Sequence, residues 1–111
     1  MGIVLGVDVG TSGTKAIAMN AEGELLASAL VEYPLHTPKP NWAEQDPADW
    51  AQAAYDALAQ LASKIDASDV KGIGLTGQMH GSVFLDGNNE VIRPALLWCD
   101  QRTTAQCQAI N

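Results

Sequence analysis

The hydrophobic pattern begins with three short runs separated by turns. Residues 3–9 are apolar and rich in β-branched side chains, as in a buried strand, and a glycine-rich turn at 10–13 follows them. Residues 14–19 alternate like a second strand, and after another turn residues 24–31 have the pattern of a third. Three strands at such short spacing predict an antiparallel meander.

A helix is predicted after an irregular, proline-rich connection at residues 33–41. Asp46 is a good N-cap, and Pro47 suits the first helical position. Trp42, just before the helix, is assigned to packing. The helix should end within residues 63–69. Apolar side chains recur at spacings of three and four and form one stripe: Trp50, Ala54, Leu58, Leu61 and Ile65.

The second half of the chain predicts further strands. Residues 71–76 form one, and a glycine-rich corner at 77–81 follows it. Residues 82–92 have the pattern of a hairpin, residues 94–99 that of an apolar strand, and residues 102–111 begin a helix. The resulting order β-β-β-α-β excludes a plain doubly wound nucleotide fold, whose first strand leads directly into a helix.

Charge and composition narrow the class of protein. The 111 residues allow one domain at most, and 13 acidic against 6 basic side chains give a net charge of -7. Without a Lys/Arg cluster, a nucleic-acid partner is not expected, although nucleotide phosphates can still be neutralised by metal ions and backbone amides. No signal peptide or membrane span is expected, so we predict a cytoplasmic protein. Cys99 and Cys107 lack the spacing of a zinc site and are predicted to be free thiols.

The strongest chemical signal is the turn after the first strand. Gly10 and Gly13 allow the backbone to turn tightly, so that N–H groups and the hydroxyls of Thr11, Ser12 and Thr14 can converge on a phosphate. The turn is not a Walker A loop, because the G-x-x-x-x-G-K-[ST] spacing is absent and a strand follows it.

Asp8 ends the apolar strand just before this turn. A carboxylate in a buried strand is costly unless it binds positive charge, and Mg²⁺ held near phosphates is the natural candidate. The alternative is a plain hairpin in which Asp8 caps turn amides. The acid in combination with two spaced glycines and three hydroxyls favours the phosphate site.

The run DVGTSGTKA at 8–16 resembles the first phosphate loop of the actin-like ATPase fold. Three later stretches narrow the resemblance to the FGGY carbohydrate kinases: NWAEQDP at 41–47, GIGLTGQMHG at 72–81 and PALLWCDQR at 94–102. The resemblance covers nearly the whole chain and implies an α/β, ribonuclease H-like (actin-like ATPase) fold. Members of the family are several times longer and have a second domain. Residues 1–111 are therefore expected to be the N-terminal part of the first domain, without the aspartate that acts as the catalytic base, and inactive alone.

The motif QMHG at 78–81 resembles that of the xylulose kinases within this family. The implied reaction is transfer of the γ-phosphoryl group of ATP to D-xylulose, which gives D-xylulose 5-phosphate. Met79 and His80 are then implied to contact the sugar, and Gln78 beside them is predicted to bind the substrate too; glycerol kinases carry Arg-Glu at the place of Met79 and His80. Trp98 is a further sugar-contacting candidate, because an indole can pack on the C–H face of a sugar, although strand tryptophans are more often core.

The resemblance also implies the cofactors ATP and Mg²⁺. Asp8 is the expected catalytic and metal-binding residue. Six consecutive residues are expected to lie against the phosphates: Gly10, Thr11, Ser12, Gly13, Thr14 and Lys15. Asp100 and Arg102 either pair with each other or lie near the sugar.

Several alternatives stay open on the sequence alone. L-ribulose, gluconate or glycerol could replace D-xylulose as the substrate. A non-catalytic sugar-binding module is a second class, and an actin-like structural or chaperone ATPase is a third, although it has no use for QMHG. The expected partners are D-xylulose and ATP, with no nucleic acid and no membrane. The resemblance allows a homodimer of the full-length protein.

Overall fold

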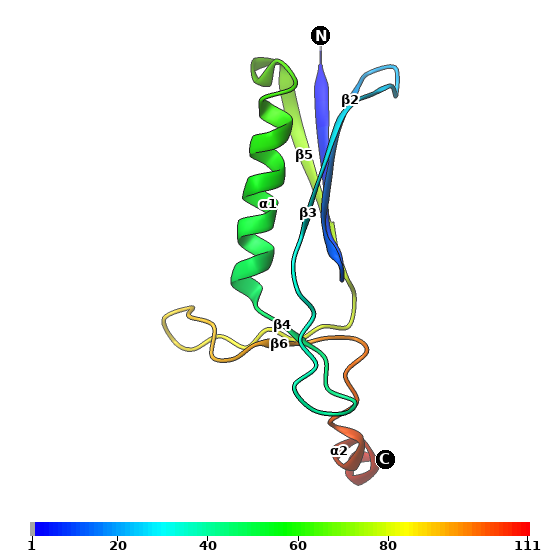
Figure 1. Cartoon of the computed structure of the whole chain (residues 1–111), viewed down its shortest axis with the longest axis vertical. Helices are drawn as coiled ribbons and strands as arrows, with labels where there is room; N and C mark the ends of the chain where they lie inside the picture. The colour runs from blue at the N-terminus through cyan, green and yellow to red at the C-terminus, as the bar shows by residue number, and fades with distance from the viewer. Residues whose placement is uncertain (1) are drawn as a thin grey trace. The chain divides into compact units, whose positions relative to one another are not determined.

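The computed structural model describes residues 2–111, which form two compact units (Figure 1). The first, here called the sheet unit, contains the chain up to Tyr33 and the segment Ala48–Gln78. The second, the loop unit, contains Pro34–Pro47 and Met79–Asn111. Of the helices formed by residues 2–111, none has the length and apolar character that a membrane span needs.

A four-stranded sheet of order β3-β2-β1-β5 builds the sheet unit. The strands β1 (Ile3–Val9), β2 (Gly13–Asn20) and β3 (Leu25–Glu32) form an antiparallel meander, and β5 (Val70–Gly77) pairs in parallel with β1. Within the sheet unit the predicted order β-β-β-α-β is confirmed; along the chain, a two-residue strand of the loop unit, β4 (Glu44–Gln45), comes between β3 and the helix.

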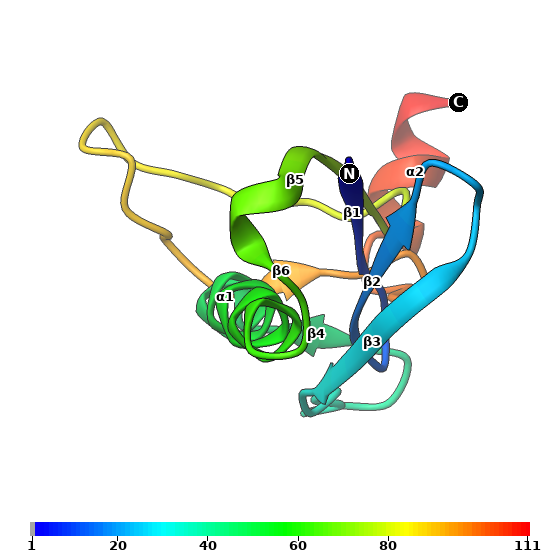
Figure 2. The same ribbon diagram turned by 90° about the horizontal axis from the view of Figure 1, so that it is seen from above.

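The helix α1 (Pro47–Ala62) covers one face of this sheet, and the short 3-10 helix η1 (Ala67–Asp69) leads into β5 (Figure 2). The predicted start of α1 at Pro47 is confirmed. The predicted stripe is also confirmed in part, because Leu61 is fully buried and Ala54, Leu58 and Ile65 pack against the core. The prediction missed two small side chains that are equally central: Ala53 and Ala57.

Alternation along β1 separates the two faces of the sheet. Ile3, Leu5 and Val7 are buried in the core cluster that α1 also enters, whereas Val4 and Asp8 are exposed on the other face. Because side chains alternate along a strand, this register fixes which residues of β1 can meet a ligand.

The loop unit has little regular structure. β4 (Glu44–Gln45) pairs antiparallel with β6 (Ala95–Leu96), and α2 (Thr104–Ile110) lies near the C-terminus. β4 was not predicted, because two residues carry no periodic signal. The predicted helix is confirmed over seven of the ten expected residues.

Two segments of this unit contain less β-structure than predicted. The strand expected over residues 94–99 is only β6, because the chain turns at its end, where the N–H of Asp100 donates to the carbonyl of Leu97 at 3.0 Å. The hairpin expected over residues 82–92 closes through its turn and a bridge between Leu85 and Val91, but contains no continuous strands.

Gly13 gives a first prediction, because β2 and β3 approach closely at this residue. A Cβ at Gly13 would lie 2.7 Å from the carbonyl oxygen of Val31 and 3.0 Å from the Cα of Glu32. We expect Gly13→Ala to destabilise the chain by about 1–3 kcal/mol, since backbone atoms must move apart. Urea denaturation measures the change. Gly72→Ala is the control, because a Cβ at Gly72 meets nothing within 4 Å. Equal stability of the two variants would contradict the prediction.

Candidate functional site

The turn between β1 and β2 is held by hydrogen bonds from several sides. The N–H of Gly10 donates to the carbonyl of Gly13 at 3.0 Å, and the N–H of Tyr33 donates to the carbonyl of Ser12 at 3.4 Å. The carbonyl of Gly10 accepts from the hydroxyl of Tyr33 and, at 3.3 Å, from Nε2 of Gln78. These hydrogen bonds give the turn a defined shape.

The three hydroxyls of the predicted phosphate loop have different environments. Thr11 Oγ1 donates to Oε1 of Gln78 at 3.2 Å, and Ser12 is exposed. Thr14 is fully buried, and its hydroxyl donates to the oxygen of Tyr33 at 3.3 Å. The structure thus places the hydroxyl of Ser12 at the surface and directs that of Thr14 into the protein.

Tyr33 stays a hydrogen-bond donor at neutral pH. Burial raises the pKa of its phenol; the hydrogen bond from Thr14 lowers it by less, and the charge of Asp8 raises it further. The phenol thus keeps its proton and can donate it to the carbonyl of Gly10.

Asp8 is exposed, which corrects one step of the sequence argument. Its carboxylate does not suffer the cost of burial that was expected to require a cation, because it lies on the open face of the sheet, opposite Lys15 in the β1–β2 register. An open hollow of about 610 Å³ on the sheet is lined by Asp8, Lys15, Ile17 and Thr76, among others. Asp8 is therefore accessible to a ligand in this hollow.

A metal ion would need ligands beyond the protein. Within residues 2–111, no three His, Cys, Asp or Glu side chains cluster so as to hold a metal. Mg²⁺ is commonly bound by one or two carboxylates together with water and substrate phosphates. The single accessible carboxylate of Asp8, which precedes the turn, fits that mode.

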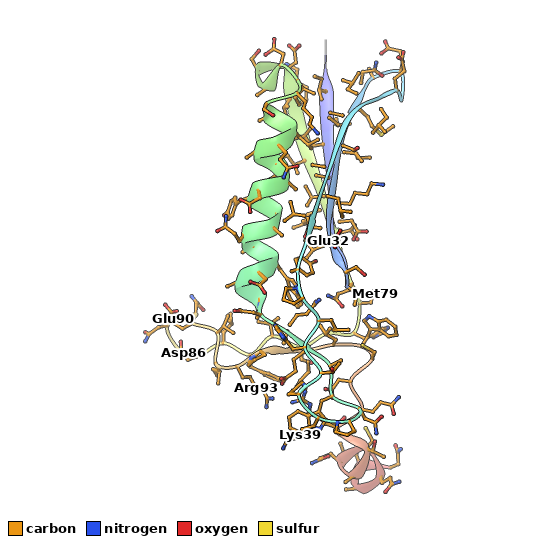
Figure 3. The ribbon with its side chains drawn as sticks, viewed as in Figure 1. Glu32, Lys39, Met79, Asp86, Glu90 and Arg93 are labelled. Carbon is orange, nitrogen blue, oxygen red and sulfur yellow. The ribbon has the colours of Figure 1, made fainter. Side chains whose placement is uncertain are left out.

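Three of the four residues predicted to bind the sugar lie in the loop unit: Met79, His80 and Trp98. Met79, which is labelled in Figure 3, is 73% exposed, and His80 and Trp98 are exposed too. His80 has φ of 61°, a left-handed conformation that costs a residue other than glycine about 1–2 kcal/mol. Ser82 follows the corner and exchanges backbone hydrogen bonds with Leu96, so the chain is fixed directly beyond His80.

Gln78 lies in the sheet unit and belongs by its contacts to the turn. Its side chain bonds to Thr11 and Gly10, and its N–H donates to the carbonyl of Val9 at 2.9 Å. The expectation that Gln78 also contacts a sugar stays a prediction.

Asp100 and Arg102 pair with each other, which settles one alternative left open by the sequence. Nε of Arg102 donates to both carboxylate oxygens of Asp100 at 3.0 and 2.8 Å, and Nη1 lies 3.0 Å from Glu44 Oε2. The guanidinium stacks on Trp42 at 3.6 Å from the ring centroid. Asp100 also accepts the N–H of Ala43 at 2.8 Å. This buried cluster joins the segment around β4 to the loop that carries Trp98.

Comparison with known proteins identifies the family. The model of the FGGY family of carbohydrate kinases, N-terminal domain, matches residues 3–111. The chain belongs to the FGGY family of carbohydrate kinases. The solved FGGY kinases share its architecture, so the predicted actin-like, ribonuclease H-like fold is confirmed.

Relatives of this FGGY chain include kinases named for different substrates. It is 46% identical over 109 residues to the xylulose kinase of Bacillus subtilis (strain 168), covering 96% of the chain and 22% of that protein. It is 36% identical over 114 residues to the glycerol kinase of Ralstonia pickettii (strain 12J), covering all of the chain and 23% of that protein. A crystal structure of a "xyloylose kinase" from Brucella ovis matches with a TM-score of 0.92 and 38% identity, covering 97% of the chain and 23% of that protein. The FGGY chain thus spans less than a quarter of these relatives.

Sequence reasoning missed two parts of the site in this FGGY chain. Tyr33 was counted only as the start of an irregular connection, because its partners are 19 and 23 residues away. Glu44 was part of a family motif, but its role as a partner of Arg102 has no local signal, since the two are 58 positions apart.

Acid should destabilise the loop unit through Asp100. Burial alone would raise the pKa of this carboxyl, but hydrogen bonds from Arg102 and Ala43 and the charge of Arg102 outweigh burial and lower the pKa to about 2, against an ordinary 3.8. The resulting stability is complete above about pH 4 and is lost as the pH falls towards 2. Urea titrations from pH 5 to 2 should show this loss in the wild type and a smaller one in Asp100→Asn. Asp56→Asn, on the exposed side of α1, is the control and should keep the wild-type slope; the same slope in Asp100→Asn would refute the assignment.

Proposed function

We propose that this chain supplies the phosphate turn and the sugar-binding corner of an ATP-dependent kinase that converts D-xylulose to D-xylulose 5-phosphate. One observation carries the proposal: the strained and exposed His80 lies two residues after Gln78, whose side chain bonds to the turn. Since consecutive Cα atoms are 3.8 Å apart, His80 cannot be far from a residue that contacts the phosphate turn. Backbone strain of this kind is concentrated at functional sites.

Phosphoryl transfer depends mainly on positioning and on electrostatic stabilisation of the transferred group. Mg²⁺, when bound, would neutralise phosphate charge, and Asp8 is the residue that would hold it. The turn from Gly10 to Lys15 would lie against the phosphates. Met79 offers an adaptable apolar wall, and His80 can donate or accept hydrogen bonds with sugar hydroxyls. Trp98 would pack on the sugar ring or chain.

We also propose that residues 1–111 form the N-terminal part of the first of two kinase domains. The share of the relatives that the chain spans, 22–23%, supports this. The catalytic base and most adenine contacts would then come from other parts of a longer protein. On this proposal the chain alone does not phosphorylate sugar.

A hybrid kinase tests the proposal. In it, this chain replaces the matching segment of the Bacillus subtilis xylulose kinase, to which it is 46% identical. We expect ADP release that depends on Mg-ATP and on D-xylulose, with a higher kcat/KM for D-xylulose than for L-ribulose, gluconate or glycerol. A hybrid that folds and binds Mg-ADP but prefers another of these substrates would overturn the assignment of D-xylulose.

His80 should control the affinity for the sugar in the hybrid kinase. Loss of one hydrogen bond to a neutral hydroxyl costs about 0.5–1.5 kcal/mol, so His80→Ala should raise the KM for D-xylulose roughly threefold to tenfold. The KM for ATP should stay within about twofold. His36→Ala, an exposed histidine outside the corner, is the matched control and should change neither constant. Equal increases for both substrates in His80→Ala would instead indicate general misfolding.

A further inference from the structure

We propose that Gln78 and Tyr33 are positioning residues which together fix the orientation of the peptide group between Gly10 and Thr11 in the phosphate turn. The proposal rests on the proposed function, because it assigns these side chains a role in phosphate binding. Neither touches the reacting groups in this scheme; both act through the turn.

Gln78 uses both ends of its carboxamide on two adjacent residues. Nε2 donates to the carbonyl of Gly10 at 3.3 Å, and Oε1 accepts from the hydroxyl of Thr11 at 3.2 Å. Its own N–H is bonded to Val9 at the end of β1. Only a side chain with a donor and an acceptor of this length can make both contacts, so glutamate or methionine would each lose at least one.

Tyr33 approaches the same carbonyl from the end of β3. It is 8% exposed, and its backbone N–H and its hydroxyl bond to Ser12 and Gly10 respectively. Because Thr14 donates its hydroxyl proton to the oxygen of Tyr33, the proton of Tyr33 is directed to Gly10. The contacts form one relay from Thr14 through Tyr33 to Gly10.

Two donors on one carbonyl fix a peptide plane. The peptide bond is planar and trans, so the carbonyl of Gly10 and the N–H of Thr11 point in opposite directions. By holding the carbonyl, Tyr33 and Gln78 also set the direction of that N–H. Preorganised backbone donors stabilise phosphate charge best when they do not have to reorient during the reaction.

Kinetics of the hybrid kinase test the proposal. In each of the single variants Tyr33→Phe and Gln78→Met, we expect kcat/KM for Mg-ATP to fall about three- to tenfold, through a higher KM, a lower kcat or both. A loss of this size corresponds to one lost hydrogen bond. The KM for D-xylulose should change less than twofold in Tyr33→Phe. The fold loss in kcat/KM for Mg-ATP in the double variant should be smaller than the product of the two single losses, because both residues act on the carbonyl of Gly10. Tyr55→Phe and Gln60→Met, both exposed on α1, are the matched controls.

A second measurement separates this proposal from the proposed function. In the 111-residue chain itself, amide hydrogen exchange at Gly10 and Tyr33 should become faster in Tyr33→Phe and Gln78→Met, because the bonds of these amides to Gly13 and Ser12 lose their support. Unchanged exchange together with unchanged kinetics for ATP would overturn the positioning role. If exchange accelerates but the parent hybrid does not phosphorylate D-xylulose, the proposed function is wrong, whereas the positioning of the turn by Tyr33 and Gln78 is supported.

Discussion

Asp8→Asn should lower kcat of the hybrid kinase about 10²–10³-fold, the usual effect of removing one electrostatic contribution to a transition state. Asparagine has nearly the same shape but no charge, and so holds Mg²⁺ and its phosphates poorly. The carboxylate of Asp8 is exposed beside the hollow on the sheet, so this loss should not come from a change in stability. The KM for D-xylulose should stay within about threefold of the parent value.

Steady-state kinetics at saturating Mg-ATP, together with urea denaturation of the same proteins, checks this prediction. Asp56→Asn is the matched control, since Asp56 lies on the exposed side of α1 and bonds only to Gln52 among the contacts described. Turnover within threefold of the parent would reduce Asp8 to a cap of the turn, the alternative that the sequence left open.

Arg102→Met should destabilise the loop unit by about 3–5 kcal/mol, because it leaves the nearly buried carboxylate of Asp100 without its cationic partner and leaves Glu44 with Arg93 alone. The cost exceeds that of a surface ion pair, since the side chain of Arg102 is only 10% exposed and also stacks on Trp42. Urea denaturation measures the change. The tryptophan fluorescence of the chain, which includes Trp42 and Trp98 of the loop unit, should show the unfolding transition at a lower urea concentration than in the wild type.

Arg93→Met is the control for this effect. Arg93 pairs with the same carboxylate of Glu44 at 3.3 Å, but its side chain is 42% exposed. Exposed ion pairs contribute about 0–1 kcal/mol, so this variant should be close to the wild type. Similar losses in the two arginine variants would show that the ion pairs, and not burial and stacking of Arg102, determine the stability of the loop unit.

The parts of the fold that the sequence predicted are those held by local patterns. The alternation of β1 and the start of α1 at Pro47 depend on residues within a few positions of each other, so each leaves a signal in the sequence. The extent of β6 depends on where Leu97 and Asp100 meet, which no local pattern records. For the same reason the strand expected over residues 94–99 was too long.

The residues of the candidate site likewise divide into those with a local sequence signal and those whose contacts are distant in the sequence. The glycines of the turn could be predicted because they mark a tight backbone path, and Gly13 does lie against β3. The burial of Asp8 was predicted wrongly, because an apolar strand does not reveal which of its faces a helix covers. Tyr33 and the partner of Arg102 could not be predicted, since their contacts join residues that are 19 to 58 positions apart.

The most direct test of the central claim is a second hybrid, in which this chain replaces the matching segment of the Ralstonia pickettii glycerol kinase. The measured quantity is kcat/KM for glycerol, before and after Met79→Arg and His80→Glu are introduced together, the pair that glycerol kinases carry by resemblance. If the corner of this chain is built for D-xylulose, the second hybrid should be nearly inactive on glycerol, and the double substitution should restore activity at least tenfold. Activity on glycerol equal to that of the parent kinase, or a loss that the double substitution does not restore, would contradict the account.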